Sequence, residues 1–334
     1  MPARKTESRI PANCQAADLG EAVVAPDGRC ALVSFITSPL ALNRENGYIV
    51  FVTDAGLSTE AESFEWTFTE NGGAPSTQTT QFGEIAYQPQ STGALDLKVR
   101  ILDAGNNEQA SLTLTQYVGT LQPQLEALIS SASDEPGPGV GNPDVVRELV
   151  NDYSVYYQAV SLQSPEEDDA FQHFLFSMVF DGALQRTPGG RRQHIENLAV
   201  ALNNETGDFA ALIVDGVGVC GIRLALLAMT TKNGGGGSTP LISWTELPDV
   251  ANKRDFADEQ LCQAVAELGE DARIDLFNMA RFPKSNITAC GRIVEALRDR
   301  YFSGTTFSDV VTGMSGTRAQ WIVRHYREGP LSRS

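Results

Sequence analysis

The chain has 334 residues and a net charge of −17, with 42% hydrophobic and 20% charged residues. This length allows two domains, each with its own core. The acidic balance argues against nucleic-acid binding as a main role, since phosphates need a basic surface, and no apolar run approaches the roughly 18–20 residues of a membrane span.

Residues 1–19 are predicted to be an N-terminal extension. Arg4 and Lys5 are basic, but the apolar stretch that a secretory signal requires does not follow them. We therefore expect cytoplasmic synthesis without a signal peptide, and the final location stays open, including a released particle. Five cysteines without a CxxC pair favour reduced thiols, although Cys14 and Cys30 could pair in an oxidising compartment.

Residues 20–120 are predicted to form an antiparallel β-sandwich, because apolar residues there recur at every second position. Phe64, Trp66 and Phe68 share one strand face, and we expect Trp66 to lie in the core. Turn signals stand at 71–73 and 103–107, and short strands at this spacing are typical of a sandwich. The expected strands cover 21–25, 30–35, 48–52, 64–69, 83–87, 95–101 and 110–117.

Residues 20–118 also carry a family pattern. It consists of Phe64-x-Trp66-x-Phe68, the turn Asn71-Gly72-Gly73, Ser76-Thr77, Tyr87 and Gly93-x-Leu95-x-Leu97-x-Val99-x-Ile101-x-Asp103-x-Gly105. This pattern resembles a PKD-type repeat, an immunoglobulin-like sandwich. It departs from the family after the tryptophan, where an Asp-rich turn is replaced by residues 69–73. The resemblance implies a module for binding or spacing and no catalytic residue.

Residues 121–142 are predicted to be a linker, and 143–330 an all-α helical domain. The stretch 131–142 is rich in Ser, Pro and Gly, and after it apolar residues recur at threes and fours instead of twos. Asn142-Pro143-Asp144 combines a capping residue with a proline and an acid of a first turn. The expected fold class is therefore α+β, as two domains.

The helical domain should contain several amphipathic helices. The first carries a stripe within 145–160, and the second carries Phe171, Phe174, Leu175, Met178 and Val179, which we interpret as core and not as a cofactor pocket. Ser285 is expected to cap the helix that buries Ile287, Cys290, Ile293, Val294, Leu297 and Tyr301. Trp321, Ile322, His325 and Tyr326 should form the buried face of the last one. The helix that Ser285 is expected to cap should span 286–302, and the last helix 317–327. Other helices are expected at 190–203, 207–214, 219–231, 256–268 and 271–281.

A GxGxxG pattern spans residues 216–221. A dinucleotide site would also need a second strand that ends in an acid about 20 residues later. Residues 232–238 are a glycine-rich loop instead. We therefore predict a tight turn or close helix packing at these glycines, and no cofactor.

Other catalytic patterns are incomplete. Asp169 and His173 could share a helical face, but two ligands do not make a zinc site, and neither His194 nor His325 belongs to a metal motif. Ser315 fails the nucleophile-elbow pattern because residue 317 is threonine. Cys220 has no histidine close in sequence. No metal site is predicted.

One acid is a weak catalytic candidate. Glu246 lies two residues after Trp244, and a carboxyl beside a tryptophan can have a raised pKa and act as an acid. Acids are common in this chain, so we interpret this segment as a loop before a helix. Asn204 and Asn286 start glycosylation sequons that we interpret as coincidental.

The leading hypothesis is a non-enzymatic structural or adaptor protein of a multi-protein assembly that uses the β-sandwich for partner binding. The general character of the chain, without a diagnostic motif, also suggests an accessory protein of a contractile injection particle. The alternatives are a cell-wall or polysaccharide hydrolase with Glu246, and a surface carbohydrate- or protein-binding module. Residues 285–334 hold seven arginines against four acids, which could meet an acidic partner or face water. A homo-oligomer stays open.

Overall fold

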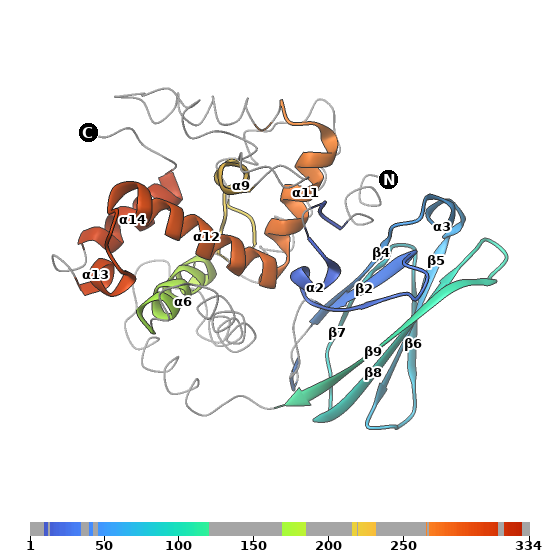
Figure 1. Ribbon diagram of the computed structural model, residues 1–334. Coiled ribbons are helices and arrows are strands. Elements are labelled where there is room, and N and C mark those ends of the chain that lie inside the picture. Colours follow the sequence, from blue (N-terminus) through green and yellow to red (C-terminus); the bar gives the residue numbers. More distant parts are fainter. Residues whose placement is uncertain are drawn as a thin grey trace. The chain divides into compact units, whose positions relative to one another are not determined.

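The computed structural model describes residues 10–12, 14–34, 40–42, 46–119, 169–184, 216–218, 220–231, 265, 267–312 and 317–328 (Figure 1). Contacts divide the chain into two compact units. The first unit is Met1–Glu135 with Phe282–Lys284, and the second unit is Pro136–Arg281 with Ser285–Ser334. Strands in the first half and helices in the second confirm the coarse expectation of an α+β chain. The predicted linker lies outside the described residues.

Two sheets form the first unit. One has the strand order β1-β2-β4-β7 and the other β3-β9-β8-β5-β6. All neighbours run antiparallel except β3 and β9, which are parallel. The bounds are β1 Glu21–Val24, β2 Cys30–Ser34, β3 Leu40–Ala41, β4 Asn46–Val52, β5 Ser63–Glu70, β6 Ser76–Thr80, β7 Glu84–Tyr87, β8 Gly93–Leu102 and β9 Glu108–Gly119. The short polar β6 and the two-residue β3 were not among the expected strands.

Aromatic side chains join the two sheets. Phe68 of β5 stacks on Tyr87 of β7 at 3.8 Å between ring centroids, and it contacts Tyr48 of β4 at 5.8 Å. Trp66 is fully buried, as expected, and its Nε1 donates to Thr80 Oγ1 at 2.8 Å. The alternating apolar residues of β5 therefore face the other sheet.

A buried polar group also links the sheets. Gln116 of β9 accepts a hydrogen bond from the Tyr48 hydroxyl at 3.0 Å. Its Nε2 donates to Ser34 Oγ at 3.0 Å and to a Glu21 carboxylate oxygen at 2.7 Å. A slip of β9 would separate buried polar groups from their partners, which is costly. These bonds therefore help to fix the register between the sheets.

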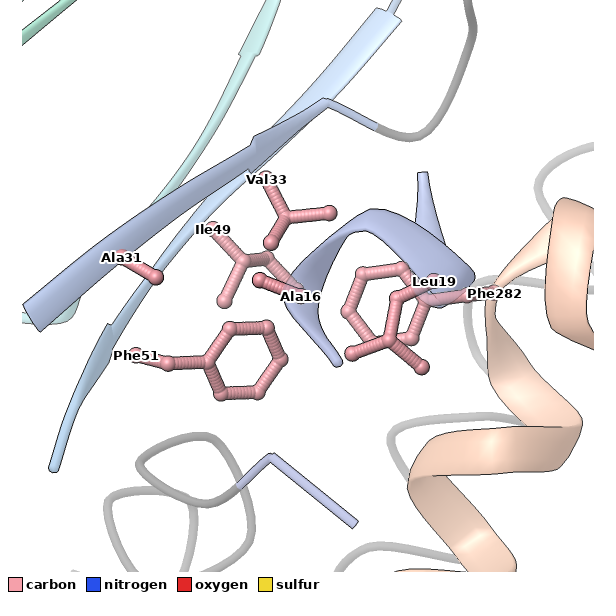
Figure 2. Close-up of a cluster of buried hydrophobic side chains, with 7 residues drawn as sticks. All are labelled: Ala16, Leu19, Ala31, Val33, Ile49, Phe51 and Phe282. Carbon is pink, nitrogen blue, oxygen red and sulfur yellow. The ribbon is translucent and has the colours of Figure 1, made fainter. Parts of the chain in front are cut away.

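The two central strands of the first sheet, β2 and β4, are buried on both faces, because a short helix covers the face that points away from the second sheet. This helix, α2 (Ala16–Leu19), lies within the predicted extension. Its apolar side chains join a cluster with alternate residues of β2 and β4 (Figure 2). The cluster consists of Ala16, Leu19, Ala31, Val33, Ile49, Phe51 and Phe282, the last of which belongs to the same unit. The extension is therefore partly structured.

Both predicted turns are confirmed. Asn71 and Gly72 have φ of 50° and 68°, the positive values that a type I′ hairpin turn needs. Asp103 accepts hydrogen bonds from the backbone N–H of Gly105 and Asn107, both at 2.8 Å. The residue types thus determine where the β5–β6 and β8–β9 hairpins reverse.

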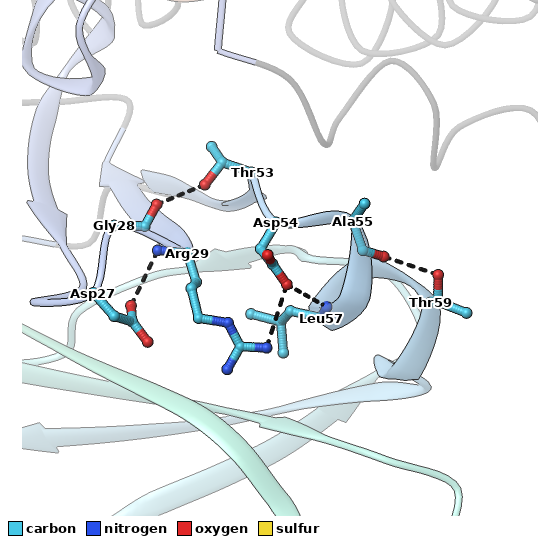
Figure 3. A network of polar contacts seen from close by, with 8 residues as sticks. All are labelled: Asp27, Gly28, Arg29, Thr53, Asp54, Ala55, Leu57 and Thr59. Atoms are coloured by element: carbon cyan, nitrogen blue, oxygen red, sulfur yellow. Dashed lines mark hydrogen bonds and ion pairs between the residues drawn. The ribbon is translucent and has the colours of Figure 1, made fainter.

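A third polar network holds helix α3 (Ala55–Glu60) to the β1–β2 turn (Figure 3). Asp54 caps the helix by accepting from the Leu57 N–H at 2.7 Å, and Arg29 Nη2 lies 3.3 Å from the same carboxylate. The Leu57 hydrogen bond has the largest effect on the pKa of Asp54 and lowers it. Desolvation opposes this effect, but the contacts with Arg29 lower the pKa further, so the net shift is downward. The network therefore fixes one end of the sheet.

The described part of the second unit is helical. Its helices are α6 (Asp169–Leu184), α9 (Leu224–Thr230), α11 (Glu270–Arg281), α12 (Pro283–Tyr301), α13 (Phe307–Thr312) and α14 (Thr317–Glu328), where the first two residues of α12 belong to the first unit. The predicted apolar faces of α6 and α12 are buried, except that Tyr301 is partly exposed. On α14, Ile322, His325 and Tyr326 are buried and Trp321 is partly exposed. In the described ranges, no helix has both the length and the apolarity to cross a bilayer.

Two helix predictions need correction, and one helix was not expected. The helix expected at 219–231 begins only at Leu224, because Val217 and Ile222 pair in an antiparallel bridge just before it. Ser285 is not a cap: α12 begins at Pro283, a favoured first helical residue, and the Ser285 hydroxyl donates to Met279 O at 2.6 Å. Helix α13 was not expected. The helices predicted at 145–160, 190–203 and 207–214, and most of 256–268, lie outside the described residues.

Candidate functional site

Several sequence candidates cannot be placed. Glu246, His194, Ser315 and Asn204 lie outside the described residues. Within the described ranges, no three side chains from His, Cys, Asp and Glu come together as metal ligands. His173 is exposed on α6, and His325 stacks on Tyr301 at 4.4 Å.

The GxGxxG segment is a tight turn. Val217 and Ile222 form an antiparallel bridge, and Gly218 and Gly221 have φ of 73° and 59°. A Cβ on Gly216 would lie 1.9 Å from Gly221 O. Gly216 is therefore required by the close approach of the backbone at Gly221, while Gly218 and Gly221 supply the positive φ of the turn. A tight turn was one of the two roles predicted for these glycines.

Asn286 of α12 holds this turn in place. Its Oδ1 accepts from the Cys220 N–H at 2.8 Å, and its Nδ2 donates to Val217 O at 2.9 Å and Ala280 O at 2.6 Å. The side chain is fully buried, so a glycan transferase could not reach it in the folded unit. Sequence reasoning treated this sequon as coincidental and missed its structural role, because the partner is 66 residues away.

The Cys220 thiol is suited to packing and not to nucleophilic attack. Desolvation and then a hydrogen bond that the Cys220 thiol makes to Cys290 raise its pKa well above the ordinary value. The Tyr326 hydroxyl donates to Cys220 O at 3.0 Å. A nucleophilic cysteine needs a lowered pKa and some exposure, and Cys220 has neither.

Glu70 has many partners in the first unit, yet its role is structural. Its carboxylate accepts from the Tyr87 hydroxyl at 2.8 Å and from the Ser91 N–H at 2.7 Å and hydroxyl at 2.5 Å. Partial burial opposes ionisation, but hydrogen bonds from Ser91, Gln90 and Tyr87 outweigh it and lower the pKa of Glu70. The carboxylate ties the loop before β8 to the end of β5.

The second unit carries a groove of about 480 Å³ between α6, α13 and α14. Its apolar wall is formed by Phe174, Val311, Ala319 and Val323. Val311 is 39% exposed, and it is one of three large apolar residues exposed in the described part of the chain. The groove is open to solvent, and its rim carries the polar residues His173, Ser177, Gln320 and Arg324.

The first unit carries an open sheet edge at β6. This strand ends the five-stranded sheet and pairs with β5 through Ser76–Thr80. Its residues are Ser, Thr, Gln, Thr and Thr, exposed except for Thr80, and none is charged. An edge strand directs the backbone N–H and C=O groups of alternate residues away from its sheet. β6 can therefore accept another strand.

The sheet face beside this edge, which we call the outer face, is rich in hydroxyl groups. The register places Thr77, Thr67, Lys98 and Thr113 in one row across four strands, and Thr79, Glu65, Arg100 and Ser111 in the next. Arg100 binds Glu65 and Glu108, both at 2.7 Å. Lys98 and Arg100 thus stand against Glu65, Asp96 and Glu108 on the outer face, so its charges nearly balance within a chain of net charge −17.

None of the protein-family models, curated proteins or solved structures that were compared with this chain matches it.

Proposed function

We propose that this chain is a non-enzymatic adaptor whose first unit, an Ig/PKD-like sandwich, binds an extended segment of a partner protein along β6. The observation that carries the proposal is the open, uncharged edge of that strand. Proteins usually blunt exposed edges with lysine, proline or other charges. β6 has none of these within its five residues, although Pro75 precedes it. Whether the partner belongs to a contractile injection particle stays a prediction.

The other described sheet edges are less suited to this role. β1 and β7 end the four-stranded sheet, and each carries a glutamate, Glu21 and Glu84. β3 has only two residues. β6 has five residues, and none of them is charged. A neutral strand that pairs with β6 therefore buries no charged side chain, and no loss of charge hydration opposes its binding.

β6 is also held rigidly, which lowers the entropy cost of binding. The Thr80 hydroxyl accepts a hydrogen bond from Trp66 Nε1 and donates one to Phe82 O. Thr77 contacts the Thr67 hydroxyl at 3.4 Å. The Asn71-Gly72 turn sets the start of the strand. A partner strand would therefore add to a preformed edge.

The expected affinity is modest. Two or three outward residues offer four to six backbone hydrogen bonds, each worth roughly 0.5–1.5 kcal/mol net. Association itself costs at least about 4 kcal/mol in lost freedom. Contacts of the partner with the outer face must therefore supply part of the binding energy, and its balanced charges suit a polar, uncharged segment.

The test begins with tagged protein purified from its native source and identification of the proteins that co-purify. Binding of the purified partner is then measured for wild type, Thr77→Pro and Gln78→Pro. The backbone N–H groups of successive residues in β6 point alternately toward β5 and away from it. One of the two prolines therefore removes an N–H that points outward, and the other removes a hydrogen bond to β5. The variant that retains the wild-type melting temperature should bind at least tenfold more weakly, and partner binding should protect the amides of 76–80 from hydrogen exchange.

Thr113→Lys and Thr79→Lys form a matched pair of controls, since both threonines are exposed on the outer face but only Thr79 is on the edge strand. Edge lysine should weaken binding more than lysine on β9. A chain that purifies alone and monomeric, or a partner that binds both proline variants like wild type, would show the proposal to be wrong. Self-association lost in the same variants would identify the partner as a second copy.

A further inference from the structure

We propose that the groove between α6, α13 and α14 binds a medium-chain amphiphile with an anionic head, such as a fatty carboxylate. This site lies wholly within the second unit and is independent of the β6 edge. Its volume of about 480 Å³ falls in the range of roughly 300–1,000 Å³ that is typical of small-molecule sites.

The wall of the groove is apolar and firmly supported. Phe174 lies against Phe307 at 5.7 Å between ring centroids, and Phe307 stacks on Phe171 at 4.3 Å. On α13, Val310 is buried while its neighbour Val311 lines the groove. A hydrocarbon chain that covers Val311 would remove apolar surface from water, which is favourable.

The rim of the groove is polar and cationic. Arg324 and Gln320 lie one turn apart on α14, and His173 and Ser177 lie one turn apart on α6. No acid is among the described residues that line the groove, although the chain as a whole carries −17. Arg324 therefore places a positive charge at the mouth of an apolar groove.

These two features select the class of ligand. A hydrocarbon chain fits the apolar wall, and an anionic head fits the arginine at the rim. Each methylene buried should improve affinity about fourfold, while an exposed ion pair should contribute about two- to fivefold. The chain therefore supplies most of the affinity, and Arg324 supplies the preference for an anion.

The test is titration calorimetry of the full chain with octanoate, decanoate and dodecanoate, each below its micelle concentration. Affinity should rise by up to about fourfold per added methylene. Undecyltrimethylammonium has the same eleven-carbon alkyl chain as dodecanoate with a cationic head, and it should bind at least threefold more weakly than dodecanoate. Equal binding of the two heads, or affinity that does not change with chain length, would refute the proposal.

Three variants locate the site. Val311→Asp should fold because Val311 is partly exposed, and it should weaken dodecanoate binding more than tenfold by placing a carboxylate on the wall. Arg324→Gln should weaken dodecanoate about two- to fivefold and leave dodecanol unchanged. Arg292→Gln is the matched control, since Arg292 is exposed on α12 and does not line the groove. If Val311→Asp binds like wild type, or Arg292→Gln and Arg324→Gln lose affinity equally, the ligand does not occupy this groove.

Discussion

The side-chain oxygen of Asn286 serves the backbone N–H of Cys220 as a hydrogen-bond acceptor, the role that a backbone carbonyl has in regular structure. Its Oδ1 accepts the Cys220 N–H at 2.8 Å, and its Nδ2 reaches the carbonyl of Val217 on the other side of the same turn. A backbone turn that is buried must satisfy its polar groups. One amide from α12 satisfies groups on both sides of this turn and thereby joins it to the helix.

Asn286→Ala should destabilise the second unit by about 2–4 kcal/mol. It leaves the Cys220 N–H and the carbonyls of Val217 and Ala280 buried without this partner, and an unsatisfied buried group costs about 1–3 kcal/mol. Urea unfolding followed by circular dichroism at 222 nm measures the loss. Thr288→Ala is the control, because it also destroys the sequon but keeps the amide. Equal losses in both variants would contradict the role assigned to Asn286.

Gly218 and Gly221 make a matched pair for testing the turn. Both have positive φ, but a Cβ on Gly218 would lie 2.1 Å from Ala280 O, whereas a Cβ on Gly221 would meet nothing within 4 Å. Gly221→Ala should therefore cost only the backbone penalty of about 1–2 kcal/mol. Gly218→Ala adds a clash with the backbone, so it should cost at least about 2 kcal/mol more. Thermal unfolding of the two variants checks the difference, and equal melting temperatures would contradict the packing at Gly218.

The sequence predicted those parts of the fold that depend on near neighbours. Asn71-Gly72 and the 103–107 segment contain residues that adopt positive φ or bind their own backbone, so turns could be placed there. The alternation from Leu95 to Ile101 similarly predicted β8. A tight turn or close helix packing at 216–221 was predicted because the second half of a dinucleotide motif is missing from the sequence, and the structure has the turn.

The remaining features depend on distant residues or on patterns that hydrophobicity does not reveal. β6 is Ser-Thr-Gln-Thr-Thr, with no apolar alternation, and only its pairing with β5 makes it a strand. The cover of α2 over β2 and β4 follows from tertiary contact. Likewise, the groove brings together His173 and Arg324, which are remote in sequence. No local sequence pattern could indicate these arrangements. Glu246, the weak catalytic candidate, lies outside the described residues.

Thr80→Val should destabilise the first unit by about 1–3 kcal/mol. The substitution keeps the shape of the side chain but removes the acceptor of the buried Trp66 Nε1–H, and an unpaired buried donor costs that amount. Thr80→Ser retains the hydroxyl and should remain within about 1 kcal/mol of wild type. Guanidinium unfolding of both variants measures the difference. Equal destabilisation would mean that the methyl group, and not the hydrogen bond, is what matters.

Glu70 should make the stability of the first unit sensitive to acid. Partial burial opposes its charge, but hydrogen bonds from Ser91, Gln90 and Tyr87 lower its pKa below the ordinary value of 4.5. Because the folded-state pKa is the lower one, the carboxylate stabilises the fold above about pH 4.5, and this contribution disappears as pH falls through the folded-state pKa. The difference in melting temperature between wild type and Glu70→Gln should therefore be largest at neutral pH and shrink between pH 5 and pH 2. Glu60→Gln, at an exposed position on α3, controls for the loss of a surface charge. A gap between wild type and Glu70→Gln that stays constant over this range would mean that the amide binds the 90–91 loop as well as the carboxylate does.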